Sequence, residues 1–133
     1  MAVVQPVPQR SVLVIEDNDD ARMALVALLE LDGYVVEPAA DGPAGFEVIR
    51  AKCPDAALID IGLPGVDGYE VAKRICAMPG PRPFLVALTG YGEAEDRRRA
   101  VEAGFDAHLV KPVDPTELSA LLSREIPARG SRG

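Results

Sequence analysis

The sequence predicts an α/β fold in which five β-strands alternate with five α-helices around a single parallel sheet. Short unbroken apolar runs recur along the chain, and each is followed by a longer stretch whose apolar residues repeat at helical spacing. The length of 133 residues suits one domain. We therefore expect one domain over residues 10–125, flanked by flexible tails at 1–9 and 126–133.

The five apolar runs are the predicted strands. The first is β-branched and unbroken, as is typical of a strand that is buried on both faces. The runs are Val12–Ile15, Tyr34–Val36, Ala56–Ile59, Phe84–Leu88 and Ala107–Val110.

Helix-end signals lie between these runs. Gly33 ends the first helix, and Asp41 precedes the second helix and its early proline. Asp67 and Asp114 each begin a capping box, for the third and the fifth helix. The leucines that we expect to face the core are Leu25, Leu28, Leu29, Leu118, Leu121 and Leu122.

The fourth helix is highly charged and ends at Gly104. Its charges are spaced for ion pairs between Glu93 and Arg97 and between Glu95 and Arg99. We interpret this arginine-rich stretch as a solvated helix face that is paired with these glutamates.

The alternation of strands and helices indicates a doubly wound parallel sheet with helices on both faces. Because the crossovers between parallel strands are right-handed, few topologies remain, and the flavodoxin-like strand order 2-1-3-4-5 is favoured. In such sheets, functional sites form outside the carboxyl ends of the strands. The informative residues are therefore those that follow each strand.

Polar side chains follow four of the five strands. They are Glu16 and Asp17 after the first strand, Asp60 after the third, Thr89 at the end of the fourth and Lys111 after the fifth. Three clustered carboxylates repel one another unless a cation neutralises them, and oxygen ligands of this kind suit Mg²⁺. Together with a hydroxyl and an ammonium, they supply the positioning and charge neutralisation that phosphoryl transfer needs. Asp60 is the natural nucleophile, because a carboxylate can form an aspartyl phosphate.

At this point the sequence resembles the receiver (response-regulator) domain of two-component phosphorelay signalling. The resemblance spans about Ser11 to Leu122, nearly the whole chain. The segments that carry it are Glu16-Asp17, Asp60-Ile61-Gly62-Leu63-Pro64-Gly65-Val66-Asp67-Gly68, Ala87-Leu88-Thr89-Gly90 and Lys111-Pro112.

The resemblance implies a signalling switch, not an ordinary turnover enzyme. It implies that a sensor histidine kinase or a histidine phosphotransfer protein donates a phosphoryl group to Asp60, with self-phosphorylation and slow autodephosphorylation as its only chemistry. Mg²⁺ would be held by Glu16, Asp17, Asp60 and the main-chain carbonyl of Gly62. Thr89 and Lys111 would read the phosphorylation state and shift the surface of the fourth helix, fifth strand and fifth helix, which binds an unknown downstream target.

Two positions depart from the usual pattern of this family. Glu16 stands where the family commonly has aspartate, and His108 stands where it commonly has a tyrosine or phenylalanine switch. We interpret His108 as a partly exposed histidine of the last strand. We also hypothesise that Tyr91 overhangs the site and slows the approach of water to an acyl phosphate. For the Lys111–Pro112 bond, the following proline makes a cis peptide plausible.

The composition excludes other function classes. The chain has 21 acidic and 14 basic residues, a net charge of −7, which argues against direct nucleic-acid binding and against an anionic membrane. No apolar run approaches the roughly 20 residues of a membrane span, and the start has no signal-peptide pattern. Cys53 and Cys76 lack the spacing of a metal or redox motif. We expect a cytoplasmic protein.

One rival function class is a haloacid-dehalogenase-type, Mg²⁺-dependent phosphohydrolase, whose DxD motif Asp17-Asn18-Asp19 mimics. Against it, Ala21 stands where Thr or Val is expected, no acidic pair follows Lys111, and the chain is too short for a cap domain. A flavin-binding module is excluded, because its first loop would have to bind phosphate and here that loop is acidic. Whether the chain is a free-standing regulator or a receiver from a hybrid kinase stays open, as do its kinase, its target and its oligomeric state.

Overall fold

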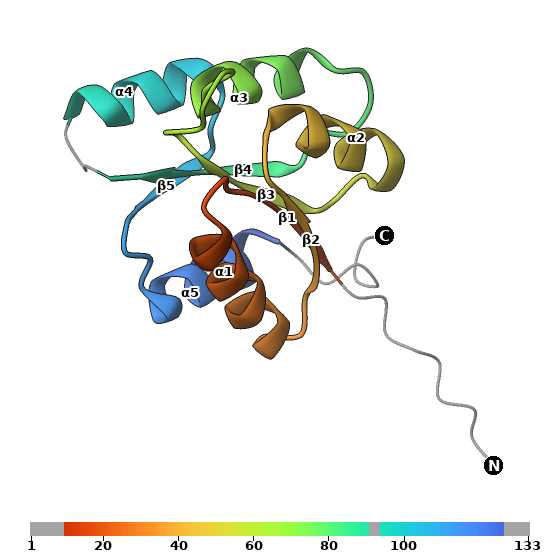
Figure 1. The fold of residues 1–133 in the computed structure, drawn as a ribbon, viewed down its shortest axis with the longest axis vertical. Coiled ribbons are helices and arrows are strands. Elements are labelled where there is room, and N and C mark those ends of the chain that lie inside the picture. Colours follow the sequence, from red (N-terminus) through yellow and green to blue (C-terminus); the bar gives the residue numbers. More distant parts are fainter. Residues whose placement is uncertain (1–9, 91–93, 127–133) are drawn as a thin grey trace.

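A computed structural model describes residues 10–90 and 94–126 of the chain, and its core is one five-stranded parallel sheet (Figure 1). The strand order is β2-β1-β3-β4-β5, which confirms the predicted order. The strands are β1 Ser11–Ile15, β2 Val35–Ala39, β3 Ala56–Asp60, β4 Phe84–Thr89 and β5 Ala107–Val110. The helices are α1 Asp19–Leu31, α2 Gly42–Lys52, α3 Gly68–Ala77, α4 Ala94–Ala103 and α5 Pro115–Glu125.

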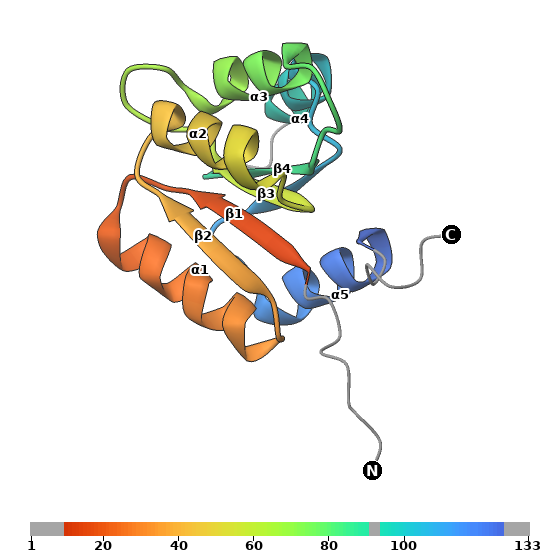
Figure 2. The same cartoon turned by 90° about the vertical axis from the view of Figure 1, so that its right-hand side faces the viewer.

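Helices cover both faces of the sheet. Figures 1 and 2 show α2, α3 and α4 on one face and α1 and α5 on the other. Each face has its own apolar core, and β1, β3 and β4 contribute alternate residues to the two. Their unbroken apolar runs are therefore explained, since both sides of these strands are buried.

The helix starts follow from short polar side chains. Asp41, Asp67 and Asp114 cap α2, α3 and α5, as predicted, each by accepting a hydrogen bond from a main-chain N–H of the first turn. Asn18 caps α1 in the same way, through Ala21 N–H at 2.8 Å.

The edge strand β2 runs further than the predicted Tyr34–Val36 and includes Pro38. Within the described residues it pairs only with β1, so the N–H groups on its other side are not needed for strand pairing. An edge strand tolerates a proline for this reason.

The charged face of α4 differs from the prediction. Glu95 forms its ion pair with Arg98, three residues away, and not with Arg99. Arg99 instead places its guanidinium 4.1 Å from the ring centre of the buried Tyr69, on α3. A desolvated ring face competes well for an arginine, because cation–π attraction strengthens as water is removed. The other expected partner, Glu93, lies outside the described residues.

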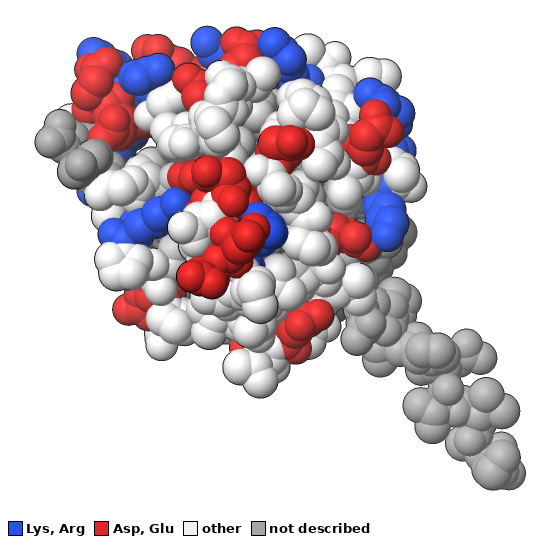
Figure 3. Space-filling model, viewed as in Figure 1, with Lys and Arg blue, Asp and Glu red and all other residues white. Residues whose placement is uncertain are grey.

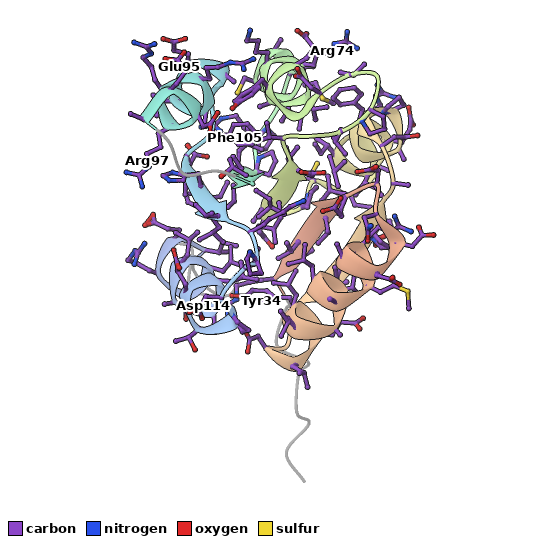
Figure 4. The ribbon with its side chains drawn as sticks, turned by 60° about the vertical axis from the view of Figure 1, so that its left-hand side comes forward. Tyr34, Arg74, Glu95, Arg97, Phe105 and Asp114 are labelled. Carbon is purple, nitrogen blue, oxygen red and sulfur yellow. The ribbon has the colours of Figure 1, made fainter. Side chains whose placement is uncertain are left out.

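Figure 4 shows the two sides of α4. Glu95 and Arg97 extend from the helix into solvent, and both are exposed. Phe105 lies beneath the helix, where it joins the core of that face. The solvated half of the prediction for this helix is therefore confirmed.

The two ends of the described chain meet at the opposite end of the sheet from the strand carboxyl ends. Arg10 donates a hydrogen bond of 2.8 Å to the carbonyl of Ile126 and lies over the ring of Tyr34. Ile126 is buried, so the packed core reaches one residue past the expected boundary at 125. The rest of the predicted tails, 1–9 and 127–133, lies outside the described residues. None of the described helices is long and apolar enough to cross a membrane.

Candidate functional site

The carboxyl end of the sheet brings the predicted site residues together. Carboxylate oxygens of Glu16, Asp17 and Asp60 lie within 4.8 Å of one another. Glu16 and Asp60 are buried, whereas Asp17 is exposed. Figure 3 shows acidic side chains gathered on this face, over the β1–α1 turn and the start of α1. The predicted cluster therefore forms, with one solvent-facing member and two members in the interior.

Lys111 reaches into the cluster from the end of β5. Its Nζ lies 2.7 Å from Glu16 Oε1 and 3.0 Å from Asp60 Oδ1. Its main-chain N–H donates to the carbonyl of Thr89 at 2.7 Å, and the Lys111–Pro112 peptide bond is cis, as the sequence suggested. One ammonium thus bridges the two buried carboxylates.

Burial and hydrogen bonding oppose each other in this site. Burial raises the pKa of Glu16, although hydrogen bonds from Lys111 and from the Asn18 N–H act in the other direction. For Lys111, burial alone would lower the pKa, but the bonds to Glu16 and Asp60 outweigh it and the pKa is raised. Lys111 is therefore charged at neutral pH, and the carboxylates next to it have a fixed positive partner.

The Asp60 carboxylate is oriented by its own loop. The Gly62 N–H donates to Asp60 Oδ1 at 3.1 Å, the same oxygen that receives Lys111. Among the described residues, Oδ2 of Asp60 accepts no hydrogen bond. The loop also packs closely, since a Cβ on Gly68 would lie 2.5 Å from the Asp60 carbonyl oxygen. One carboxylate oxygen is thus fixed, and the other is left available for chemistry.

Thr89 ends β4 with its side chain buried at the same edge of the sheet. Its hydroxyl Oγ1 is buried and has no hydrogen-bond partner within the described part of the chain. Because a buried hydroxyl without a partner costs free energy, such a group points to a missing acceptor or donor.

The remaining predicted positions surround this centre. His108 is half-buried and lines a hollow between β5 and α5, together with Glu117 and Arg124. Gly62 follows Asp60 in the loop where a carbonyl ligand was predicted. Tyr91, the residue expected to overhang the site, lies outside the described residues.

Sequence reasoning missed two residues near the β1–α1 turn, one at the N-cap of α1 and one in its first turn. Asn18 donates its N–H to Glu16 Oε2 at 3.2 Å, and Arg22 donates to the Glu16 main-chain carbonyl at 2.8 Å. The capping preference of Asn at a helix start was a readable signal for the first. For Arg22 the only signal was its spacing from Asp19, with which it forms an ion pair.

The donor set fits Mg²⁺. Its members are carboxylate oxygens, which suit a small hard cation, and the exposed member leaves room for the waters that Mg²⁺ retains. The Thr89 hydroxyl, which has no partner among the described residues and lies at the same edge of the sheet, suits a phosphoryl oxygen. The site therefore has the parts for holding a metal and a phosphoryl group at one carboxylate.

Comparison with known proteins agrees with this geometry. The family described as the response regulator receiver domain matches residues 12–123. An uncharacterised 14.6 kDa protein of Leptolyngbya boryana is 34% identical over 122 residues, which cover 91% of this chain and 93% of that protein. The transcriptional regulatory protein AfsQ1 of Streptomyces coelicolor is 38% identical over 92% of this chain, but only over 53% of its own length.

A solved structure shares both the fold and the sequence pattern. The receiver domain of a sensor histidine kinase of Pseudomonas aeruginosa, which has a magnesium ion coordinated in its active-site cleft, is 33% identical. It superimposes with a TM-score of 0.82, over 90% of this chain and 98% of that one. Apart from the Leptolyngbya protein, the chain spans about half the length of the first curated relatives that it matches.

Proposed function

We propose that this chain, which belongs to the response regulator receiver domain family, accepts a phosphoryl group on Asp60. The observation that carries the proposal is the environment of this one carboxylate. Lys111 and the Gly62 N–H fix Oδ1, while two further carboxylates and an unpartnered Thr89 hydroxyl lie at the same edge of the sheet. No other described carboxylate combines these neighbours.

The chemistry proposed is direct transfer to the free oxygen. Asp60 Oδ2 attacks the phosphorus of a phosphohistidine, the new bond is an acyl phosphate P–O bond, and the P–N bond breaks. The donor imidazole leaves with the bonding electron pair and takes up a proton. Bound Mg²⁺ supplies charge neutralisation for the phosphoryl oxygens, and Glu16, Asp17, Asp60 and the Gly62 carbonyl would hold it.

Lys111 and Thr89 have the second role in the proposal. Phosphorylation of Asp60 converts a single carboxylate charge into a more negative group, which attracts the Lys111 ammonium and offers an acceptor to the Thr89 hydroxyl. Thr89 is the last residue of β4, and Lys111 follows the last residue of β5. Their movement therefore shifts the packing of the surface formed by α4, β5 and α5. A local charge change thereby selects between two surfaces for a partner.

The partners follow from the family and from charge. Receiver domains take phosphoryl groups from histidine kinases, and we propose a sensor histidine kinase or a histidine phosphotransfer protein as the donor here. The excess of acidic residues favours a protein target over direct contact with nucleic acid or membrane, and the proposed location is the cytoplasm. AfsQ1 is a transcriptional regulator, but the match covers only 53% of it.

The phosphohydrolase alternative has no support from these comparisons, and the contacts of its motif also disfavour it. The Asn18 side chain caps α1, and the Asp19 carboxylate pairs with Arg22. The second aspartate of the DxD motif is thus engaged in an ion pair at the helix start.

The direct test is intact-mass analysis after incubation with acetyl phosphate. We expect a gain of one phosphoryl mass that requires both Mg²⁺ and Asp60, so that Asp60→Asn and EDTA each abolish it. Asp41→Asn is the matched control, because Asn also caps a helix and Asp41 lies outside the cluster. A gain that persists in Asp60→Asn would overturn the assignment, and a phosphoryl group found on Asp17 instead, with turnover of phosphate esters, would favour the hydrolase.

A further inference from the structure

Arg22 lies on the first turns of α1, with its side chain 18% exposed, and it points to the main chain beneath the acidic cluster. We propose that Arg22 is a positioning residue of the metal site: it fixes the peptide that carries Asp17 and thereby sets the affinity of the site for Mg²⁺. The inference rests on the proposed function, since it concerns the same site.

The guanidinium makes two contacts of different kinds. One nitrogen, Nη1, donates to the main-chain carbonyl of Glu16 at 2.8 Å, and Nη2 contacts Asp19 Oδ1 at 2.5 Å. The planar fork of arginine holds both acceptors at once, which fixes its own position. The Asp19 ion pair therefore holds one nitrogen of the fork, while the other nitrogen holds the Glu16 carbonyl.

The Glu16 carbonyl belongs to the peptide unit that leads into Asp17. Because a peptide unit is planar, fixing its oxygen fixes the direction of the Asp17 N–H and restricts the placement of the Asp17 side chain. The Glu16 N–H, one residue back, is held by the Ala39 carbonyl at 3.0 Å. On the other side of Asp17, the Asn18 N–H is held by Glu16 Oε2.

The Asp17 side chain has no such support of its own. It is exposed, and no hydrogen bond or ion pair holds it within the described part of the chain, in contrast to Glu16 and Asp60, which share Lys111. Its position thus depends on the main chain. Without a metal, repulsion from the two buried carboxylates pushes it outward, and the tie through Arg22 opposes that movement.

Magnesium is sensitive to such placement, because it demands near-octahedral oxygen geometry. Residues that orient metal ligands without touching the metal typically change metal affinity by about 10–100-fold. The charge of Arg22 is already paired with Asp19, so its influence on the metal acts mainly through geometry and not through long-range charge.

The test is calorimetric titration of the unphosphorylated protein with MgCl₂. We expect Arg22→Met to weaken Mg²⁺ binding by about tenfold. The matched control is Arg50→Met, because Arg50 also pairs with an acidic residue three positions earlier, Glu47 at 2.5 Å, but contacts no part of the site. Both variants remove one positive charge, so a difference between them reports position and not net charge.

Two further variants separate positioning from general stability. Arg22→Lys offers a single ammonium in place of the fork, and we expect it to restore part of the affinity. Asp19→Asn leaves the contact between Arg22 and the Glu16 carbonyl available. We therefore expect its Mg²⁺ affinity to fall by no more than about threefold, which is less than the loss typical of removing an orienting residue. Thermal unfolding without Mg²⁺, measured for each variant, shows how much stability each has lost.

Each outcome decides one claim. If Arg22→Met lowers the unfolding temperature but binds Mg²⁺ as the wild type does, Arg22 is merely structural and the inference is wrong. If Asp19→Asn loses as much affinity as Arg22→Met, the ion pair and not the carbonyl contact is responsible, and the inference is also wrong. If the wild type itself binds no Mg²⁺, the proposed function fails and not only the role of Arg22.

Discussion

The ammonium of Lys111 lies 2.7 Å from a carboxylate oxygen of Glu16, a residue that is only 1% exposed. The same ammonium contacts Asp60 Oδ1 at 3.0 Å, so one cation serves two buried carboxylates. In the absence of metal, Lys111 is thus the main counter-charge at this edge of the sheet. Glu16, with its longer side chain, reaches the lysine where Asp17 does not.

Removing the Glu16 carboxylate is therefore expected to destabilise the fold. Glu16→Ala loses charge-assisted bonds from Lys111 and from the Asn18 N–H, and we expect a loss of about 2 kcal/mol in the free energy of unfolding. The estimate is below the cost of breaking a fully buried pair, because the Lys111 side chain is 32% exposed and keeps Asp60 as a partner. Urea unfolding measures it.

Glu37→Ala is the control for this variant, since Glu37 pairs with Lys52 at 2.5 Å on the surface, where ion pairs contribute under about 1 kcal/mol. Glu16→Gln keeps an oxygen acceptor for Lys111, so we expect it to lower the free energy of unfolding by less than Glu16→Ala does. Equal unfolding midpoints for Glu16→Ala and Glu37→Ala would show that the interior pair contributes no more than a surface pair.

The sequence was sufficient for the fold because its signals are local. Unbroken apolar runs predict strands buried on both faces, and short polar residues such as Asp41, Asp67 and Asp114 predict helix starts. Parallel crossovers then leave one favoured order, which the structure confirms. The positions of Glu16, Asp60, Thr89 and Lys111 at one edge followed directly, since carboxyl ends of parallel strands meet there.

Contacts between side chains of different helices and strands could not be predicted from the sequence. The choice of Arg99 for Tyr69 over Glu95 depends on where α3 places a buried ring, and no spacing within α4 encodes that. The tie from Arg22 to the Glu16 carbonyl is similarly invisible, because its acceptor is a main-chain atom that every residue has. The sharing of Lys111 between Glu16 and Asp60 needs the relative depth of β1, β3 and β5.

Thr89→Val should leave the stability of the unphosphorylated protein intact but impair its response to phosphorylation. The Thr89 hydroxyl is buried without a partner among the described residues, so replacing it with a methyl group removes an unsatisfied polar atom. We expect the free energy of unfolding to stay equal or to rise by up to about 1 kcal/mol. In the phosphorylated protein, the same variant lacks the proposed donor to the phosphoryl group.

The readouts for Thr89→Val are urea unfolding of the unphosphorylated protein and the phosphorylation-induced change in amide exchange of α4 and β5. Val86→Ala, in the middle of the same strand, is the control for general damage, and its lost packing should cost roughly 1–3 kcal/mol. A marked destabilisation by Thr89→Val would mean that the hydroxyl has a partner in the unphosphorylated state.

Alkaline titration should detect a late ionisation of Tyr69. Burial raises its pKa above the ordinary value near 10, although Arg99 over its ring acts in the other direction. A raised pKa in the folded state means that its contribution to stability is complete below the ordinary pKa and is lost as pH rises through the folded value. Tyr69→Phe should therefore flatten the alkaline fall in stability.

The absorbance of tyrosinate measures this directly as pH is raised in the folded protein. Tyr69→Phe should remove a phenol that ionises late, and Tyr34→Phe should remove another, because burial also raises the pKa of Tyr34. If Tyr69→Phe instead removes a phenol that ionises with the ordinary tyrosine pKa, the Tyr69 ring is solvated in solution. In that case Arg99 does not pack against it as the structure shows.

Gly68 is the position at which the usual effect of an alanine substitution should reverse. Replacing a helical glycine by alanine ordinarily adds roughly 0.5–1 kcal/mol of stability. At Gly68 the new Cβ would lie 2.5 Å from the Asp60 carbonyl oxygen and 2.7 Å from the Ile61 Cα, both main-chain atoms that cannot turn aside. We expect Gly68→Ala to cost about 1–3 kcal/mol, the range for overpacking.

Gly90→Ala is the matched control for Gly68→Ala, because a Cβ there meets nothing within 4 Å. It should leave the free energy of unfolding within about 0.5 kcal/mol of the wild type, as for most surface substitutions. Since the clash at Gly68 pushes on the backbone of the proposed phosphoacceptor, Gly68→Ala should also slow the gain of phosphoryl mass from acetyl phosphate under conditions where the protein stays folded. If Gly68→Ala is as stable as wild type and is phosphorylated at the same rate, the close packing of α3 against the end of β3 does not hold in solution, and the fixed orientation of Asp60 must come from Lys111 and the Gly62 N–H alone.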